Sequence, residues 1–313
     1  MQWYGISFLC FLTMIVGIKT ACCPSEPKNN NLSTVLFNEA YRPTDTLLQL
    51  LKLMNIEHDS TLQSIVSETQ KQWLRPRGQE RWGNQKEFTY TYDELSQTFE
   101  DLYLIQEIKP ACKNYTYAVL LGGTISCVRN RLSFLIKLWN EGIRFKNIII
   151  LSGERPLDNS IESQEIIVHP NCASLPLKRG WRYKGKLPTT ETEMIKFVLD
   201  QTELPHAWNS LPLVFINTPL QKTEQGAVRR PTTHDTVKEW LTEHHPKPGS
   251  VLSVSTQPFI GYQHSVLRAL LPKDFVLHTV GNSIDSIDMT IGTVLDSLAR
   301  WIYNEHRMRK ASL

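Results

Sequence analysis

The sequence lacks the features that mark several common classes of protein. It has 6 cysteines in 313 residues, and Cys10, Cys22 and Cys23 all lie near the N-terminus, which excludes a scaffold held by many disulfides. The formal net charge is only +3, too small to favour nucleic acid as a partner. No internal repeat or low-complexity tract occurs. The composition, 41% hydrophobic and 21% charged, is ordinary for a globular protein.

Several motifs of catalysis and metal binding are absent as well. There is no GxSxG nucleophile turn and no HExxH helix. The remaining cysteines, Cys112, Cys127 and Cys172, do not have CxxC spacing. They allow one disulfide with a leftover thiol, or three buried thiols. His169 with Cys172 is a lone pair, short of a zinc site, so the sequence predicts no metal and leaves open whether the protein is an enzyme.

The first 21 residues differ from the rest of the chain. Residues 3–18 carry no charge and are rich in Phe, Leu, Ile and Val, which is typical of the apolar part of a secretory signal. A cleaved signal peptide, an uncleaved membrane anchor or lipoprotein, or neither are the alternatives. A signal or an anchor predicts an exported protein that is periplasmic, envelope-associated or secreted, with membrane contact through this segment. Residues 22–33 are polar and predict a linker.

Residues 34–110 predict a helical N-terminal region. Residues 46–54 are rich in leucine and predict one helix. In the next segment, Leu62, Ile65, Val66 and Trp73 fall on one face of a second helix. A third helix follows Thr91, with Glu94 placed to complete a capping box. Between the last two helices, residues 73–85 hold Arg75, Arg77 and Arg81 beside two tryptophans. This stretch is either an anion-binding loop or a solvated loop with stacked Arg and Trp side chains.

Residues 117–154 predict a βαβ unit, around which the rest of the chain is arranged. Apolar runs at 118–121 and 148–151 flank a segment with apolar residues at helical spacing. The two strands should be parallel, and their continuous Val, Ile and Leu indicate burial on both faces. Because ligands bind beyond the carboxyl ends of such strands, the small and polar residues there predict a site.

Further alternation of strands and helices fills residues 111–313. Apolar strands are expected at 213–217, 251–255 and 275–280, and helices at 191–199, 232–241, 261–271 and 285–307. The sequence therefore predicts an α/β three-layer Rossmann-like sandwich, with a mostly parallel sheet of about five strands and an N-terminal helical extension.

The candidate ligand-binding residues follow the predicted strands or open the predicted helices. Gly122 and Gly123 let a ligand approach the backbone, but they form neither GxGxxG nor a P-loop with its lysine. Arg129 and Arg131 lie in the first helix of the βαβ unit, either pointing back to the strand ends or exposed. His234 with Asp235 is an acid/base pair or part of a helix start. The strand-end and helix-start candidates are Gly122, Gly123, Thr124, Arg131, Ser152, Gly153, Glu154, Arg155, Thr232, Thr233, Asp235, Ser255, Thr256 and Gln257.

A long connection at residues 155–190 is expected to cover this site. Its second half, residues 177–186, is cationic through Lys178, Arg179, Arg182, Lys184 and Lys186. Such a loop either closes over an anion or forms a solvated hairpin.

The motifs in residues 117–300 have a recognisable order. They are LLGG at 120–123, Arg131, LWNEG at 138–142, IIILSGE at 148–154, ETEM at 191–194, RPTTHDT at 230–236 and VSTQPFIGYQHSVLRA at 254–269. In this order the chain resembles the SanA/ElyC/YdcF-type family of envelope-associated proteins, as a divergent member. The resemblance adds Glu191 and Gln263 to the candidates, Gln263 standing near the position of a family arginine. It implies a Rossmann-like fold and a role in envelope biogenesis, with S-adenosylmethionine as a candidate cofactor.

The sequence supports three functional hypotheses. The first is an exported protein that binds an anionic small molecule, nucleotide-like or a lipid-linked phosphate, at the strand ends. The second is a non-enzymatic envelope interaction protein whose N-terminal helices bind an unknown protein partner. The third is a secreted factor that acts on a host.

Overall fold

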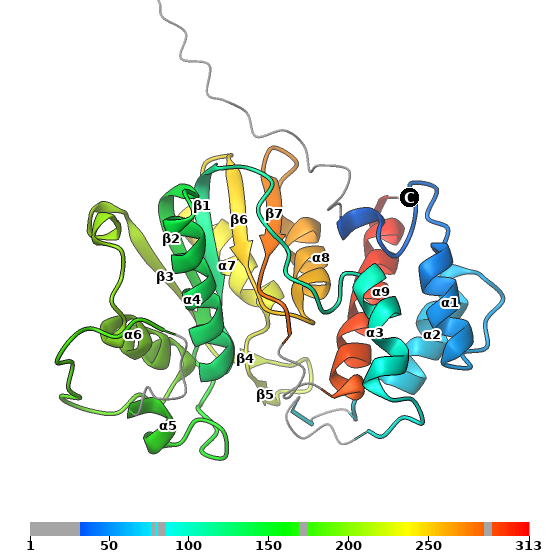
Figure 1. Cartoon of the computed structure of the whole chain (residues 1–313), viewed down its shortest axis with the longest axis horizontal. Coiled ribbons are helices and arrows are strands. Elements are labelled where there is room, and N and C mark those ends of the chain that lie inside the picture. Colours follow the sequence, from blue (N-terminus) through cyan, green and yellow to red (C-terminus); the bar gives the residue numbers. More distant parts are fainter. Residues whose placement is uncertain (1–31, 77–78, 81–85, 169–174, 285–289, 313) are drawn as a thin grey trace, which may run out of the picture.

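The fold is a parallel sheet between two layers of helices. The computed structural model describes residues 32–76, 79–80, 86–168, 175–284 and 290–312. Five parallel strands form the sheet in the order β3-β2-β1-β6-β7, shown edge to edge in Figure 1. They are β1 (Asn114–Leu121), β2 (Arg144–Gly153), β3 (Leu213–Thr218), β6 (Ser250–Val254) and β7 (Val276–Val280). This confirms the predicted Rossmann-like α/β sandwich.

Side chains alternate between the two faces of the sheet, as strand geometry requires. Ala118, Leu120, Ile148 and Ile150 share a buried cluster with helices α4 (Ile125–Asn140) and α6 (Glu191–Gln201). Val119 and its odd-numbered neighbours share another cluster with α7 (Thr233–His244) and α8 (Ile260–Leu270). Helices on both faces explain why the strands are apolar throughout.

Both strands of the central βαβ unit begin before the apolar runs at 118–121 and 148–151 that predict them. β1 pairs with β2 from Asn114↔Arg144 to Leu121↔Leu151. The buried rings of Tyr115 and Phe145 extend the apolar surface toward the start of both strands. β1 ends at Leu121, just before its predicted glycine turn, whereas β2 continues through Gly153. The N–H of Gly122 donates to the carbonyl oxygen of Leu151 at 2.7 Å, so the two strand ends lie side by side, as expected.

The N-terminal helices pack against the last helix of the chain. They are α1 (Asp45–Leu53), α2 (Leu62–Trp73) and α3 (Tyr92–Asp101), preceded by a short helix, η2 (Leu32–Thr34). Thr91 and Glu94 form the predicted capping box of α3. These helices share one buried cluster with Leu295 and Leu298 of α9 (Ile291–Ser312). Figure 1 shows this bundle beside α8, at the β7 edge of the sheet.

Close contact between α8 and α9 joins the bundle to the sandwich. A Cβ added to Gly261 of α8 would lie 2.3 Å from ring atoms of Trp301 on α9, so only glycine permits this approach. Arg268 of α8 also pairs with Glu305 of α9 at 2.6 Å. The bundle of N-terminal helices with α9 is therefore joined to the α/β sandwich by the contact between α9 and α8.

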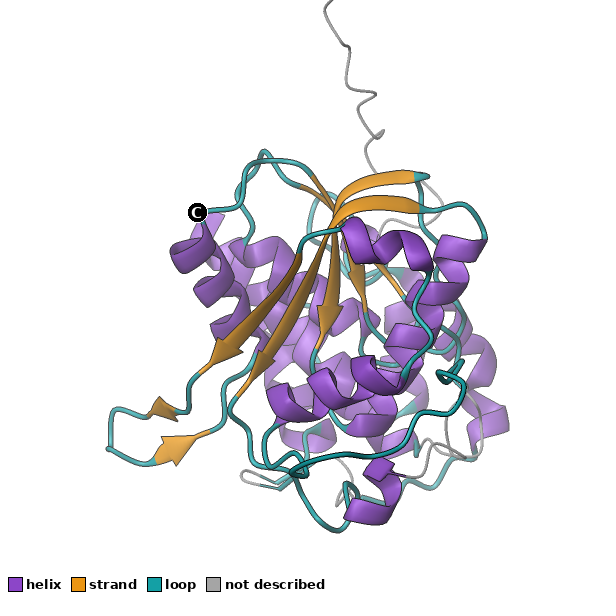
Figure 2. Ribbon diagram, turned by 90° about the vertical axis from the view of Figure 1, so that its left-hand side faces the viewer, coloured by secondary structure: helices purple, strands orange, loops and turns teal. Residues whose placement is uncertain are grey.

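The remaining elements lie in the connections. α5 (Gln164–Val168) and a short helix, η5 (His206–Ser210), flank α6 in the sequence, and β4 (Gln221–Lys222) pairs with β5 (Val228–Arg229) in a small hairpin. Figure 2 shows this hairpin projecting beyond the end of the sheet. Within the described ranges, no helix is both long and apolar enough to cross a membrane. The predicted leader and most of the linker lie outside those ranges.

Candidate binding site

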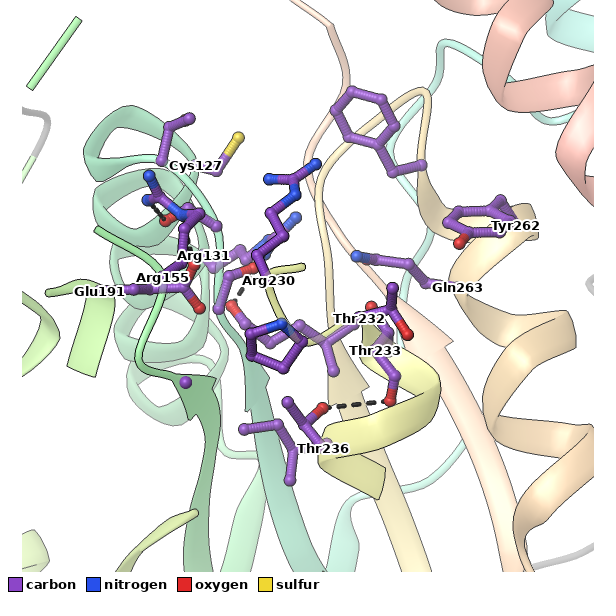
Figure 3. Close-up of a pocket in the computed structure, with 18 of the residues that line it drawn as sticks. Cys127, Arg131, Arg155, Glu191, Arg230, Thr232, Thr233, Thr236, Tyr262 and Gln263 are labelled. Carbon is purple, nitrogen blue, oxygen red and sulfur yellow. Dashed lines mark hydrogen bonds and ion pairs between the residues drawn. The ribbon is translucent and has the colours of Figure 1, made fainter. Parts of the chain in front are cut away.

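A cavity of about 400 Å³ opens at the carboxyl ends of β1 and β2, and Figure 3 shows it from the side. Its volume is within the range of sites for small organic molecules. The structure brings together in its lining ten of the sequence-predicted residues, namely Gly122, Gly123, Thr124, Arg131, Gly153, Arg155, Glu191, Thr232, Thr233 and Gln263. The strand-end crevice expected from the sequence is therefore present.

The lining is rich in arginine. Among the described residues, five arginines and one carboxylate, that of Glu191, line the cavity; the arginines are Arg75, Arg131, Arg155, Arg230 and Arg300. Guanidinium groups are always charged, and their planar donors match the oxygens of phosphates and carboxylates. The charge of the cavity therefore suits an anion.

Arg131 lies at the inner end of the cavity. It is 1% exposed, and its Nη1 donates hydrogen bonds to the carbonyl oxygens of Gly122 and of Leu121, the latter at 2.8 Å. The first of the two sequence alternatives is thus correct for Arg131, which points back to the strand ends. Arg129 is buried too, but it turns toward α5, where it donates to the carbonyl oxygen of Ile166 at 2.9 Å.

Arg155 is held between two carboxylates. Its two terminal nitrogens donate to Glu162, each at 2.8 Å, and its Nε donates to Glu191 at 2.9 Å. Although burial opposes the charged form, the bonds to Glu162 and Glu191 raise the pKa of Arg155 above its usual value. Burial raises the pKa of Glu191 despite the adjacent guanidinium. Arg155 is thereby fixed with its side chain along the cavity wall.

Glu162 occupies the N-terminus of α4. The backbone N–H of Ile125, the first residue of the helix, donates to its Oε1 at 3.1 Å. In many nucleotide-binding βαβ units a ligand phosphate takes this position, because helix N-termini attract anions. Here a carboxylate of the chain itself accepts the hydrogen bond of this N–H, although Thr124 and Cys127 at the start of α4 still line the cavity.

Glycines at the strand ends make room for the side chains of the cavity. A Cβ on Gly122 would lie 2.1 Å from Oε1 of Glu191 and 2.8 Å from the carbonyl oxygen of Leu151. A Cβ on Gly153 would lie 2.3 Å from the ring of Pro231. Both glycines are therefore needed for packing within the protein, whatever ligand is bound.

The outer wall of the cavity is formed by the bundle of N-terminal helices with α9 and by the residues before α7. Asp296 of α9 pairs with Arg75 at 2.5 Å and with Arg300 at 3.1 Å, which fixes both guanidinium groups at the cavity. Arg230, before α7, pairs with Glu80 at 2.9 Å, and both side chains are more than a third exposed. These residues close the cavity on the side away from the sheet.

Several predicted residues near the strand ends do not line the cavity. The Ser152 hydroxyl donates to the carbonyl oxygen of Ile216 on the adjacent strand β3 at 2.9 Å and accepts a hydrogen bond from Thr192 of α6 at 2.8 Å. Glu154 is exposed, since the chain turns outward after Gly153. Thr256 lies behind Arg131, with 3.5 Å between its hydroxyl and Nη2.

Three further candidates serve packing or capping. Ser255 donates to the side-chain oxygen of Gln263, and Gln257 donates to the carbonyl oxygens of Tyr103 and Gln106 in the helical layer. Asp235 caps α7: burial would raise its pKa, but hydrogen bonds from Arg229 and Thr232 lower it to about 2. Asp235 is thus an anchored capping group, and not the partner of an acid/base pair with exposed His234.

The predicted cover of the cavity, residues 155–190, is wrong for the described part of this connection. Apart from Arg155, none of its described residues lines the cavity, the cationic residues 177–186 included. The ring of Trp181 instead lies 5.4 Å from that of Phe197 on α6, and its Nε1 donates to Asp200 at 2.9 Å. An apolar surface on α6 thus holds this loop away from the strand ends.

Sequence reasoning missed several lining residues. Arg75, Arg230, Cys127, Phe259, Tyr262, Thr293 and Arg300 all line the cavity. Arg75 lies in the loop at residues 73–85, for which the sequence allows an anion site, and Arg230 begins the RPTTHDT motif. Arg300 had no local signal, because only the packing of α9 brings it to the cavity. The pair His169 and Cys172 lies outside the described residues.

Metal ligands do not cluster in the described ranges: no group of three or more His, Cys, Asp or Glu side chains is placed to hold an ion there. No family model, no curated protein and no solved structure matches this chain. The resemblance to the SanA/ElyC/YdcF-type family therefore stays a prediction.

Proposed function

We propose that this protein binds an anionic small molecule, of the nucleotide-like or lipid-linked phosphate class, in the cavity at the ends of β1 and β2. The observation that carries the proposal is the presence of five arginine side chains among the described residues of the lining. Because these guanidinium groups are held by neighbouring carbonyls and carboxylates, little side-chain freedom is lost when a ligand binds. Fixed donors of this kind favour phosphate oxygens.

The same charges weigh against S-adenosylmethionine. That molecule carries a sulfonium and an ammonium group, which outnumber its one carboxylate. Placing these cations among Arg131, Arg155 and Arg230 would cost electrostatic energy in a partly enclosed site. A phosphate ester avoids this repulsion and is the better fit to the cavity.

Arg230 is the best residue with which to test the proposal. Its side chain is 38% exposed and its ion pair with Glu80 is at the surface, so its loss should cost little stability. We expect pyrophosphate to raise the free energy of unfolding, by about 2.7 kcal/mol at a concentration 100-fold above its Kd. The variant Arg230→Gln should weaken pyrophosphate binding about tenfold, which corresponds to about 1.4 kcal/mol.

The matched control is Arg179→Gln, an exposed arginine in the loop that packs on α6. It should leave pyrophosphate binding unchanged. If neither pyrophosphate nor any phosphate ester changes the melting temperature or gives heat in calorimetry, the cavity is not an anion site. That result would favour the alternative of a non-enzymatic interaction protein.

The proposal includes export and a role at the cell envelope. Support comes from the uncharged segment at residues 3–18 and from the motif order that resembles the SanA/ElyC/YdcF-type family. Mass spectrometry of the protein from its own cells should find a chain that begins near Cys22, or a lipidated Cys22. An intact Met1 in a soluble cell extract would contradict export.

A further inference from the structure

The two sides of the cavity differ in chemistry, as Figure 3 shows. Arg131 and Arg155 lie on the side of β1 and β2, whereas Tyr262 and Gln263 lie opposite them on α8. Arg230 is between the two sides. A ligand that spans the cavity from one side to the other therefore meets Arg131 and Arg155 at one end and an aromatic ring with a side-chain amide at the other. Arg75 and Arg300, held by Asp296 of α9, line the outer wall.

Gln263 presents donors to this space. It is 4% exposed, and its Oε1 accepts a hydrogen bond from the buried Ser255 hydroxyl. This bond leaves the amide nitrogen as the end that faces the cavity, as Figure 3 shows. Throughout the described part of the chain, no atom accepts a hydrogen bond from that nitrogen. An amide nitrogen offers two N–H donors and no acceptor, so it is placed to donate to an acceptor on a ligand.

Tyr262 provides an aromatic surface next to this donor. Its ring is partly buried and lines the cavity. No described residue bonds its hydroxyl, which Figure 3 shows on the cavity side. Phe259, one turn earlier and 6% exposed, extends the same wall. Aromatic walls of this kind bind planar rings by stacking.

We propose that the ligand is a nucleoside phosphate. Its phosphate lies toward Arg230 and the arginines of the β1 and β2 side, and its base lies against Tyr262 and accepts a hydrogen bond from Gln263. This inference rests on the proposed function of the cavity as an anion site. A prenyl phosphate fits less well, because its hydrocarbon chain would cover the N–H groups of Gln263 that face the cavity and give them no acceptor.

The test compares ligands that share a phosphate and differ in the second half. Calorimetry on the full-length protein would titrate pyrophosphate, ribose 5-phosphate, UMP, AMP and farnesyl phosphate. We expect UMP or AMP to bind about tenfold tighter than ribose 5-phosphate, the effect of one stacked base. Tyr262→Leu and Gln263→Met should each reduce this preference. The control Tyr303→Leu, on α9 and 41% exposed in the wild type, should keep the preference.

Each other result overturns the inference in a distinguishable way. If ribose 5-phosphate binds as tightly as both nucleotides, there is no base site, although the anion site stands. If farnesyl phosphate binds tighter than both nucleotides, the second half of the ligand is a lipid. If no compound binds, pyrophosphate included, the proposed function fails together with this inference. The melting temperature of each variant shows whether it is folded.

Discussion

Oε1 of Glu162 accepts a hydrogen bond from the backbone N–H of Ile125 at 3.1 Å. The same carboxylate receives both terminal nitrogens of Arg155 and the N–H of Asp158 at 3.0 Å. One side chain thus fixes the start of α4, the loop after β2 and a guanidinium of the cavity. In this βαβ unit, which has neither a P-loop nor a third glycine, the Glu162 carboxylate thus takes the position that a helix-bound phosphate would occupy.

Replacing Glu162 should therefore destabilise the protein. Glu162 is 1% exposed, so Glu162→Gln leaves Arg155 buried with only Glu191 as a charged partner. Loss of one partner from a buried ion pair costs about 3–5 kcal/mol. Urea unfolding measures the change, with exposed Glu165→Gln as control. Equal urea midpoints for the two variants would show that the ion pair between Arg155 and Glu162 contributes little to stability.

The helical layer and the α/β part should unfold together. Leu298 of α9 is completely buried in the cluster that also contains α1, α2 and α3. Leu298→Ala should lower the free energy of unfolding by about 2–5 kcal/mol, while Leu53→Ala, 43% exposed in the wild type, should have a small effect. Circular dichroism and tryptophan fluorescence should give one common transition. Two separate transitions, with only one shifted by Leu298→Ala, would show that the N-terminal helices form an independent unit.

Stability should also fall in acid because of His264. Burial, aided by Arg268 and His278, lowers the pKa of His264 from 6.5 to about 3. The unfolded chain takes up this proton near pH 6.5 and the folded protein only near pH 3. The free energy of unfolding should thus decrease through this window as the pH falls, by at most about 1.4 kcal/mol per pH unit for this group.

Urea unfolding at a series of pH values between 7 and 4 measures this effect. The variant His264→Gln should flatten the dependence, whereas replacement of the exposed His234 serves as the control. His278 changes stability in the same direction, because burial lowers its pKa too. If the free energy of unfolding changed equally with pH in the wild type and in His264→Gln, His264 would not be a source of the pH dependence.

Much of the fold could be predicted because the signals are local. The apolar runs at 118–121 and 148–151, with helical spacing between them, fixed the βαβ unit, and Thr91 with Glu94 gave a helix start that the structure confirms. The arrangement of the layers was less readable. The 3.6-residue pattern of α9 shows that one face is buried, but not that this face packs against helices at the other end of the chain.

The candidate site could be predicted only in part, for a related reason. Backbone positions at strand ends follow from the parallel sheet, so Gly122, Gly123 and Gly153 were found. The direction of a side chain depends on its tertiary partners: Ser255 bonds Gln263, and Gln257 reaches the helical layer. The i,i+4 spacing of Asp296 and Arg300 permits their ion pair, but nothing local shows that the packing of α9 places Arg300 at the cavity.

Ligand protection of Cys127 tests the central claim most directly. This partly exposed residue lies in the first turn of α4, lines the cavity and carries a free thiol. Alkylation by iodoacetamide, followed at its peptide by mass spectrometry, should slow several-fold with saturating pyrophosphate, UMP or AMP, but not with uncharged ribose. Arg230→Gln should require a higher concentration of the same anion for equal protection. Unchanged alkylation of Cys127 with millimolar concentrations of every anion would contradict binding in this cavity.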